Sequence, residues 1–532
     1  MTSAEKSGNL ARPTAEQAAR FLMQATLGAT SAEIAHVTEV GFEKWIDEQF
    51  ALPSSLTHEE ARRVRYAGGH FELHHAWWRQ VLNAPDLLRQ RLATALSEIF
   101  VVSEMAIEFL PWEMLEYYDD LARLCSGNWR DLLRHITLDP LMGYYLSHLK
   151  NRKPDPALQR FPDENYAREV MQLFSIGLWE LNPDGTHRLD AQGREIPTYD
   201  NATVANFARV FTGLAFGGPL ADVTNREQFL MDALDPRFFD YSVSMKMWED
   251  EHDRDEKVLL RGLRLPAFSD DFGRKAMDDV EDALDNLFLH PNVGPFFGRL
   301  LIQRLVTSNP SPAYVERVTE AFANNGRAVR GDMRAVVKAI LLDPEAREAS
   351  PDGVASGRLR EPYYRQVWLA RSFQARAATG AYLVHDHETL KATGQLLLNS
   401  PTVFNFFLPD YRPPGAMAEA GLCGPEFQIM TSSTAITSLN CYMRSIAIGF
   451  GDDPDGPHTM RLNFEEEIRV AHDPESLLDL LGLKMAGGAL TPETRRILLD
   501  AYREMPAGYS ADEKVKAMAQ LIVVSPDFAV AH

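Results

Sequence analysis

The sequence predicts a mainly α-helical protein with a multihelical, bundle-like architecture and one small β-hairpin excursion near residues 181–199. Apolar residues recur with the 3.6-residue period of an amphipathic helix along most of the chain, and the alternation typical of strands is rare. The excursion is the exception, because the turn sequences Asn182-Pro183-Asp184-Gly185 and Ala191-Gln192-Gly193 flank short extended segments there.

The first helices are predicted close to the N-terminus. Thr14, followed three residues later by Gln17, forms a capping box and predicts a helix over 14–27. Ser31 is expected to cap a second helix over 32–40. The same helical period predicts further helices over 42–50, 85–100, 112–124, 129–137, 272–288, 295–306, 313–323, 333–342, 363–377 and 493–505.

Two segments are candidate linkers, 352–357 and 449–458, because both are rich in Gly, Pro and Asp. They divide the chain into an N-terminal and central helical region over 1–350 and a C-terminal helical region over 351–532, with one continuous domain as the alternative. The acidic stretch 232–255 has weak periodicity and is expected to form a surface loop or lid.

The charge balance narrows the function classes. The 532 residues include 54 Lys and Arg against 75 Asp and Glu, and the formal charge of −21 argues against a nucleic-acid-binding protein, which needs a basic face. No run of about 18 apolar residues could span a bilayer. The N-terminal residues carry no secretion signal, so the chain as written is expected in the cytoplasm, with a periplasmic or exported location as the alternative.

Cysteine content and short motifs exclude further classes. The three cysteines, Cys125, Cys423 and Cys441, are too few and too scattered for a disulfide framework, so buried thiols are expected. The sequence has neither a Gly-x-x-x-x-Gly-Lys loop nor a Gly-x-Gly-x-x-Gly motif after a strand, which argues against the familiar nucleotide enzymes. It also lacks the Gly-x-Ser-x-Gly motif of ordinary serine hydrolases.

The most informative segment is 162–177, which is predicted to form a helix that Gly177 is placed to end. Apolar residues form one face of this helix. Glu164 and Arg168 are four residues apart on the other side, and they are expected to form a surface pair.

Glu169 has a different place on the same helix. It lies at the border of the apolar face, with Asn165 one turn before it. Partial burial there is expected to raise the pKa of its carboxyl group, which suits it to general acid or base catalysis. The alternative is a buried carboxylate that pairs with a nearby Arg and locks two helices together.

Two histidine groups could bind a metal ion. His70 and His74 have an i, i+4 spacing that can bind zinc on a helix, and His75 follows them. No third ligand is evident, so surface or stacking histidines are the preferred interpretation. His385 and His387 form the second group, for which a solvated turn is preferred. The sequence therefore assigns no metal and no cofactor.

Two other segments carry candidate site residues. His252 and Asp253 are adjacent in a predicted loop, where functional residues tend to reside, with helix capping as the alternative. Asn405 and Phe406 belong to an aromatic-rich segment that could line a pocket for a sugar or an apolar ligand, with aromatic core packing as the alternative.

A series of short motifs follows one another along the chain. Besides the sequence Asp-Glu-Asn-Tyr-Ala-Arg-Glu at 163–169, these motifs lie at 95–103, 207–213, 252–257, 290–296, 299–306 and 400–407. In this order they resemble the bacterial family known as domain of unknown function 1800 (DUF1800), over roughly residues 10 to 530.

The resemblance implies a protein of unassigned chemistry. Members of the family are often associated with the cell envelope and encoded beside a second family with a sulfatase-like look, so a sulfatase-like protein is the implied partner. Some relatives have Trp and His before the Phe of the first motif, where this chain has Leu96, Ser97, Glu98 and Ile99. A metal role for that motif is therefore not expected here.

Two hypotheses about function follow. In the first, a hydrolase-like enzyme uses Glu169, His252 and Asp253 in acid and base catalysis on a polar or saccharide-type substrate. Its expected binding residues are Asn165, Arg168, Arg209, Asn405 and Phe406.

In the second hypothesis, the chain is a non-catalytic helical binding or assembly protein that acts with an envelope-associated partner. The enzyme hypothesis predicts a cleft in which charged groups converge. The assembly hypothesis predicts closed ion pairs and an exposed apolar patch.

Overall fold

The computed structural model describes residues 12–57, 72–107, 111–231, 240–269, 273–348, 357–380, 382, 384, 386–451, 455–488 and 490–531. The predicted mainly α-helical fold is confirmed, because helices dominate these residues and the strands form three short two-stranded antiparallel sheets. The expectations for His70, for His385 and the side chain of His387, and for most of the linker 352–357 lie outside the described residues.

The chain before the first strand is helical. Its helices are α1 (Ala15–Ala25), α2 (Ser31–Val40), α3 (Phe42–Ala51), α5 (Glu72–Asn83), α6 (Leu87–Ser97), α7 (Pro111–Leu124), α8 (Trp129–Leu138), α9 (Pro140–Tyr145), η1 (Pro156–Leu158), α10 (Asn165–Gln172) and α11 (Asn201–Val210).

The middle of the chain alternates short strands with helices. These elements are β1 (Leu214–Ala215), α12 (Arg226–Leu230), β2 (Lys246–Met247), η2 (Glu249–Glu251), β3 (Lys257–Val258), η3 (Leu260–Gly262), β4 (Arg264–Leu265), α13 (Ala276–Phe288), α14 (Val293–Leu305), α15 (Pro312–Ala323), α16 (Met333–Leu341) and α17 (Pro344–Arg347). Strand β1 pairs with β2, and β3 pairs with β4.

The last part of the chain returns to helices. Its elements are β5 (Arg358–Leu359), α18 (Pro362–Ser372), α19 (Asp386–Thr393), α20 (Ala416–Glu419), η5 (Pro425–Gln428), α21 (Thr434–Ile448), α22 (Glu465–Val470), α23 (Pro474–Met485), α24 (Pro492–Arg503), α25 (Ala511–Val523), α26 (Pro526–Ala529) and β6 (Val530–Ala531). Strand β6, at the end of the described chain, pairs with β5.

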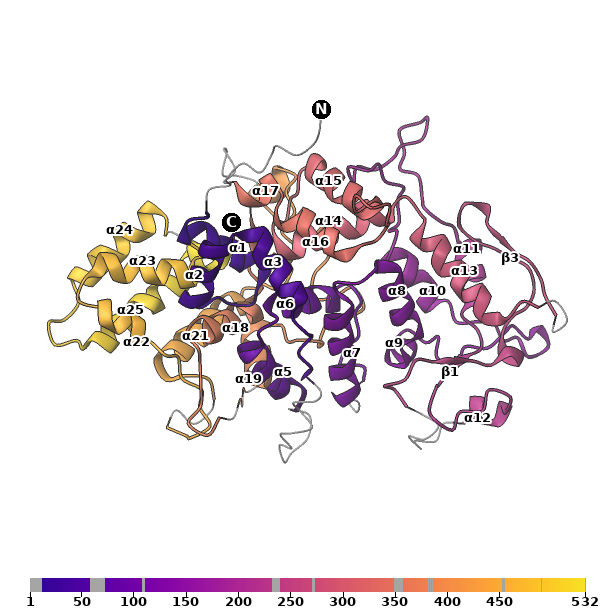
Figure 1. The fold of residues 1–532 in the computed structure, drawn as a ribbon, viewed down its shortest axis with the longest axis horizontal. Coiled ribbons are helices and arrows are strands. Elements are labelled where there is room, and N and C mark those ends of the chain that lie inside the picture. Colours follow the sequence, from indigo (N-terminus) through magenta and orange to yellow (C-terminus); the bar gives the residue numbers. More distant parts are fainter. Residues whose placement is uncertain are drawn as a thin grey trace.

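The helices form an elongated body (Figure 1). Helices α22 to α25 lie at one end, and α11 and α13 lie with β3 at the other. Helix α1 lies in the middle, where it contacts α16, α23 and β6. The first helix and the last strand therefore meet near the centre of the body.

One hydrophobic core runs through this body. It includes Ala18 from α1 and Ala531 from β6, and its members come from both sides of the predicted boundary at 350. The division into two regions stays a prediction. Within the described residues, no helix has the length and the apolar character needed to cross a membrane.

The N-terminal caps agree with the sequence in one case and differ in the other. The capping box of α1 is confirmed, because the Thr14 hydroxyl accepts from the backbone N–H of Gln17 at 3.2 Å. Helix α2 is capped by Thr30 instead of Ser31. Thr30 is the N-cap because Glu33 lies three residues later. The Glu33 carboxylate accepts from the backbone N–H of Thr30 at 2.8 Å, which completes a second capping box.

The other predicted helices are present, with ends shifted by a few residues. Helix α18 stops at Ser372, short of the predicted end at 377, and Gln374 follows with a left-handed φ of 48°. The predicted helix over 162–177 is shorter, since α10 ends at Gln172. Among the described residues, five helices of ten or more residues lie outside the predicted ranges: α5, α11, α21, α23 and α25.

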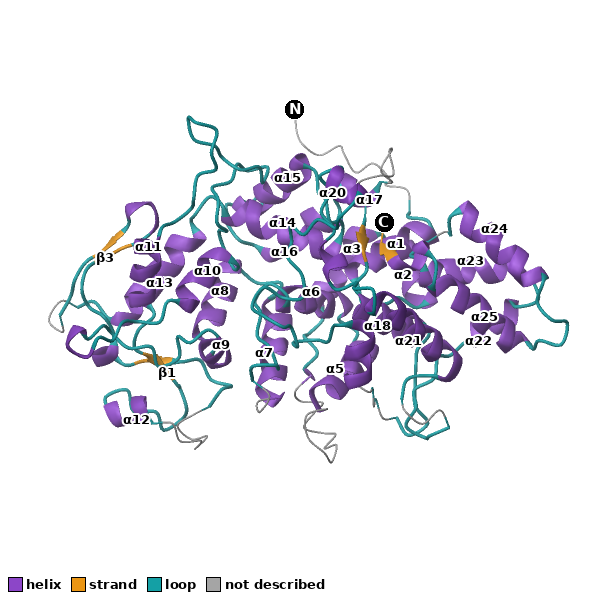
Figure 2. Cartoon of the chain, turned by 180° about the vertical axis from the view of Figure 1, so that it is seen from behind, coloured by secondary structure: helices purple, strands orange, loops and turns teal. Residues whose placement is uncertain are grey.

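The predicted hairpin excursion is confirmed and projects from the helical body (Figure 2). Bridges between Trp179 and Pro197, Leu181 and His187, and Leu189 and Glu195 hold it together. Gly185 and Gly193 stand at its two turns with φ of 77° and 78°, a conformation that glycine adopts without strain.

The acidic stretch 232–255 is not simply a surface loop. Residues 240–255 are described, and they include β2 and η2. Glu251, His252 and Asp253 are buried. The weak periodicity reflects short elements that face the core, held there by strand pairing and ion pairs that a helical period does not reveal.

Six charged side chains are buried together where α6, α14, α18 and η5 meet. We call them the central ion cluster, and each is at most 7% exposed: Arg91, Glu98, Arg304, Arg358, Glu361 and Glu426. They stand near one another in the fold but far apart in sequence, so the cluster joins distant segments of the chain.

The ion pairs of this cluster centre on Arg358. Its Nη1 lies 3.3 Å from Oε1 of Glu361 and 3.2 Å from Oε1 of Glu426. Glu98 is close to Glu361, and burial together with that neighbouring carboxylate raises the pKa of Glu98 well above its ordinary range. Glu98 also has a cation beside it, since Nε of Arg304 lies 3.5 Å from its Oε2.

Replacing Arg358 by Met is expected to lower the free energy of unfolding by about 3–5 kcal/mol, because it leaves two buried glutamates without their cation. Chemical denaturation measures this change. Arg496, which is paired with Asp500 on the surface, gives the control Arg496→Met, expected to cost about 1 kcal/mol or less. Equal effects of the two substitutions would contradict a supporting role for the cluster.

Candidate metal centre

Glu169 lies on α10 and is buried, with 6% of the residue exposed. Burial raises the pKa of its carboxyl group, which agrees with the direction expected from the sequence. Its Oε2 has no hydrogen-bond partner, and the hydroxyl of Tyr199 is also buried without one. Tyr145 is close enough for the Glu169 charge to add to the burial that raises the tyrosine pKa to about 12.

Asn165 and Arg168 lie on the outer side of α10. Asn165 is exposed, and Nη2 of Arg168 lies 3.4 Å from Oε2 of Glu164. This confirms the surface pair expected from the sequence. Glu169 itself makes no ion pair with any described residue.

Arg209, His252 and Asp253 meet in a buried ion network with Asp279. The guanidinium of Arg209 binds both oxygens of Asp253, at 2.6 and 3.0 Å. Nε2 of His252 lies 3.4 Å from Oδ2 of Asp279, which also accepts from Nζ of Lys257 at 2.7 Å.

Asp279 is fully satisfied in this network. Arg274 donates to its other oxygen at 2.6 Å. Burial alone would raise the pKa of Asp279, but His252, Lys257 and Arg274 outweigh it and hold the pKa at about 2. Closed pairs of this kind are what the second hypothesis expects of these charges.

The residues expected to act in catalysis are therefore divided between two places. Arg209, His252 and Asp253 are brought together, whereas Glu169 makes no ion pair with them in the described part of the chain. A catalytic role for Glu169, His252 or Asp253 stays a prediction.

Asn405 and Phe406 lie in a turn after residue 400. Asn405 is 6% exposed, adopts a left-handed φ of 65°, and has a buried Nδ2 without a hydrogen-bond partner. Phe406 is half-buried. Their expected role in ligand binding stays a prediction.

The histidines of α5, His74 and His75, are buried, and each contacts a different residue. Nε2 of His74 lies 3.2 Å from Oε2 of Glu104, and Nε2 of His75 lies 3.2 Å from the carbonyl oxygen of Val384. The two rings therefore engage different segments of the chain.

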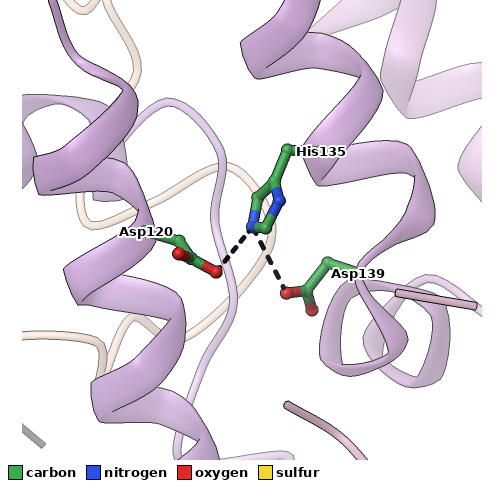
Figure 3. Close-up of side chains that lie close together, drawn as sticks. All are labelled: Asp120, His135 and Asp139. Atoms are coloured by element: carbon green, nitrogen blue, oxygen red, sulfur yellow. Dashed lines mark ion pairs between the residues drawn. The ribbon is translucent and has the colours of Figure 1, made fainter. Parts of the chain in front are cut away.

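Asp120, His135 and Asp139 form a cluster with the donor set of a metal site (Figure 3). Asp120 comes from the last turns of α7, His135 from the last turn of α8, and Asp139 from the junction of α8 and α9. One ligand atom of each residue lies within 4.8 Å of the other two. The three side chains point toward one another between the helices.

The distances suit a shared cation. Nε2 of His135 lies 2.8 Å from Oδ2 of Asp120 and 3.9 Å from Oδ2 of Asp139. Two donors that share a cation at about 2.1 Å lie roughly 3 to 3.5 Å apart, so small side-chain movements complete the geometry. The buried Nε2 makes no hydrogen bond of acceptable geometry, despite the short distance to Asp120.

Each carboxylate is held by its other oxygen. Oδ1 of Asp120 accepts from Nη2 of Arg123 at 2.6 Å. Oδ1 of Asp139 accepts from the backbone N–H of Leu141 at 2.8 Å and caps α9. These bonds fix both carboxylates and leave Oδ2 of each facing His135. In metal sites, hydrogen bonds from surrounding groups orient the ligands in the same way.

The environment of the two carboxyl groups differs. Burial raises the pKa of Asp139 to about 6. Burial alone would also raise the pKa of Asp120, but His135 and Arg123 outweigh it and hold that pKa below its ordinary value.

A cavity of about 280 Å³ adjoins the cluster and is lined by all three residues. Glu116 and Asp119 of α7 also line it, and Tyr241 and Ser242 line it from the segment before β2. One imidazole and two carboxylates suit Mn²⁺, Fe²⁺ or Zn²⁺, and a ligand set of three leaves positions open toward the cavity.

This cluster was not predicted from the sequence, where paired histidines were the expected metal ligands. Its local signal is His135 followed four residues later by Asp139. That spacing is common, and the third residue, Asp120, joins it only through the packing of α7 against α8. The signal was therefore present but too weak to use alone.

A family model described as "Protein of unknown function (DUF1800)" matches residues 20–530. The chain belongs to this family, which confirms the resemblance seen in its motifs. Neither the curated proteins nor the solved structures give a significant match.

Replacing Glu169 by Gln is expected to make the protein relatively more stable as the pH rises. The folded state holds the proton of Glu169 more tightly than the unfolded state, so the wild type loses stability as pH rises from about 4.3 through the folded pKa. Glutamine does not titrate and avoids this loss. Thermal melts of both proteins between about pH 4 and pH 8 measure the difference.

The control for this experiment is Glu164→Gln, on the exposed side of the same helix region, which is expected to show little pH dependence relative to the wild type. A Glu169→Gln variant that is less stable at pH 8 than at pH 4, relative to the wild type, would indicate an ion pair and contradict the unpartnered carboxyl.

Proposed function

We propose that this protein is a metal-dependent hydrolase that cleaves an ester or amide bond in a polar, saccharide-type substrate. The observation that carries the proposal is the convergence of Asp120, His135 and Asp139 at the wall of a cavity. This keeps the hydrolase-like chemistry expected from the sequence but moves its centre away from Glu169.

The three residues would hold the cation, and their support is already in place. Arg123 and the start of α9 bind the carboxylate oxygens that face away from His135. A divalent cation supplies Lewis acidity, which polarises a carbonyl group and makes water a stronger nucleophile near neutral pH.

The lining of the cavity favours an uncharged, hydroxyl-rich substrate. Glu116 and Asp119 add negative charge to the two carboxylates of the cluster, and Arg123, which also lines the cavity, is paired with Asp120. Acidic groups therefore outnumber the arginine, which disfavours an anionic substrate. Tyr241, Ser242 and Ser244 also line the cavity, and their hydroxyl groups can bind sugar hydroxyls.

Glu116 is the proposed general base. It stands one helical turn before Asp120 and is half-buried in the cavity wall. A carboxylate in this place can take a proton from water and pass it to the leaving group.

The first test is the metal content of the purified protein. We expect about one equivalent of a transition metal by mass spectrometry, and a roughly tenfold or greater loss in His135→Ala and Asp139→Asn. The control is His36→Ala, which removes a surface histidine that pairs with Glu48 at 2.7 Å. Equal metal content in His135→Ala and His36→Ala would overturn the metal centre.

The second test is acetate release from acetylated xylo-oligosaccharides and from N-acetylglucosamine oligomers. Glu116→Gln is expected to keep the metal and to lower kcat by about 10²–10⁴-fold. Loss of the metal in this variant would make Glu116 a ligand, and unchanged kcat would remove it from the mechanism.

The non-catalytic alternative has its own support. The ion network of Arg209 is closed, and Leu158 and Phe161 are 70% and 74% exposed just before α10. The sulfatase-like partner implied by the family resemblance would fit such a role. A protein that binds no metal and shows no hydrolysis would favour this alternative.

A further inference from the structure

A second cavity, of about 460 Å³, lies between α18, α19 and α21. None of its lining residues belongs to the Asp120–His135–Asp139 cluster. Its volume falls in the range of small-molecule sites, which is roughly 300–1,000 Å³.

Gln366 of α18 lines this cavity and is 3% exposed. Its Oε1 is buried without a hydrogen-bond partner, and its amide makes no hydrogen bond to the described residues. A glutamine amide can accept two hydrogen bonds and donate two. Leaving such a group unpaired in the interior is costly, so its place at a cavity wall indicates a ligand with matching groups.

The same cavity carries two cations. Arg444 of α21 donates from one guanidinium nitrogen to the carbonyl oxygen of Gly451 at 2.7 Å, and its other nitrogens make no hydrogen bond to the residues that the structure describes. Lys391 of α19 lies 2.9 Å from Glu388, and both side chains are about 70% exposed. Arg444 is therefore the stronger candidate to bind an anion.

Glu388, the ion-pair partner of Lys391, also lines the cavity, and the remaining lining is uncharged. Val384 and Phe450 are buried apolar residues. Cys441 also lines the cavity, and burial raises the pKa of its thiol to about 11, so the thiol is uncharged near neutral pH.

We propose that this cavity binds a small carboxylate that carries a primary or cyclic amide. The adjacent N–H and C=O of such an amide pair with both ends of the Gln366 amide. The carboxylate of the ligand binds Arg444 near the mouth, with Lys391 adding positive charge. The apolar side chains pack against the linking carbons.

Succinamate is the probe for this site, because it joins a primary amide to a carboxylate. Its matched controls are levulinate, which has a methyl ketone in place of the amide, and propionamide, which has no charge. Titration calorimetry and saturation-transfer NMR on the full chain are expected to give the tightest binding for succinamate. Levulinate and propionamide are each expected to bind at least about tenfold more weakly than succinamate.

Three variants locate the binding. Gln366→Met keeps the length of the side chain and is expected to weaken succinamate binding about tenfold while leaving the melting temperature unchanged or higher. Arg444→Ala is expected to weaken binding and to reduce its salt dependence. Arg496→Ala, which removes a surface arginine of α24, is the control and should bind as the wild type does.

Cys441 gives an independent readout, since it is the half-buried cysteine and lines the cavity, whereas Cys125 and Cys423 are buried. Bound succinamate is expected to slow its alkylation. The proposal is overturned if succinamate does not bind at about 10 mM, if levulinate binds equally well, or if Gln366→Met leaves the affinity unchanged.

Discussion

The central ion cluster is the constraint on which the middle of this molecule depends. An isolated ion buried in a protein costs several kcal/mol, so these charges are stable only as a matched set. Two of its bonds cross between helices: Arg91 of α6 donates to the backbone carbonyl of Arg304 on α14, and Arg304 donates to the backbone carbonyl of Glu98 at 3.0 Å. The reciprocal bonds fix α6 and α14 in one register. Arg358, Glu361 and Glu426 attach the start of α18 and η5 to the same point.

Helix packing connects the candidate metal centre to this core and determines the positions of its residues. Helix α7, which carries Asp120, packs against α6, and α8 packs against both α7 and α9. The donors therefore stand on helices and at a helix cap, where backbone hydrogen bonds limit their movement. Asp139 illustrates this, because one of its oxygens caps α9 while the other faces His135. The hydrogen bond that caps α9 therefore also orients Asp139 toward a ligand.

The helical fold could be predicted because its signals are local. Periodicity and capping boxes place α1, α6 and α14 within a few residues, and turn residues place the hairpin. The segment 162–177 predicted the direction of the Glu169 pKa shift correctly, since the position of Glu169 on the helix determines its burial. Partners across the fold could not be predicted in this way. Arg209 and Asp253 are separated by 44 residues and Asp120 and His135 come from different helices, so nothing local distinguishes the closed pair from the open cluster.

The carboxylates considered above fall into three physical situations, and the contrast decides which of them can bind a ligand. Asp253 and Asp279 bind cations through both oxygens and have nothing left for a ligand. Glu169 is buried with an unpartnered oxygen, yet no cation among the described residues is paired with it and no described cavity includes it. Asp120 and Asp139 are intermediate: one oxygen of each is fixed by hydrogen bonds, and the other faces an imidazole beside a cavity. A binding site needs donors that are both positioned and available, and in the described part of the chain this pair of aspartates with His135 meets both requirements.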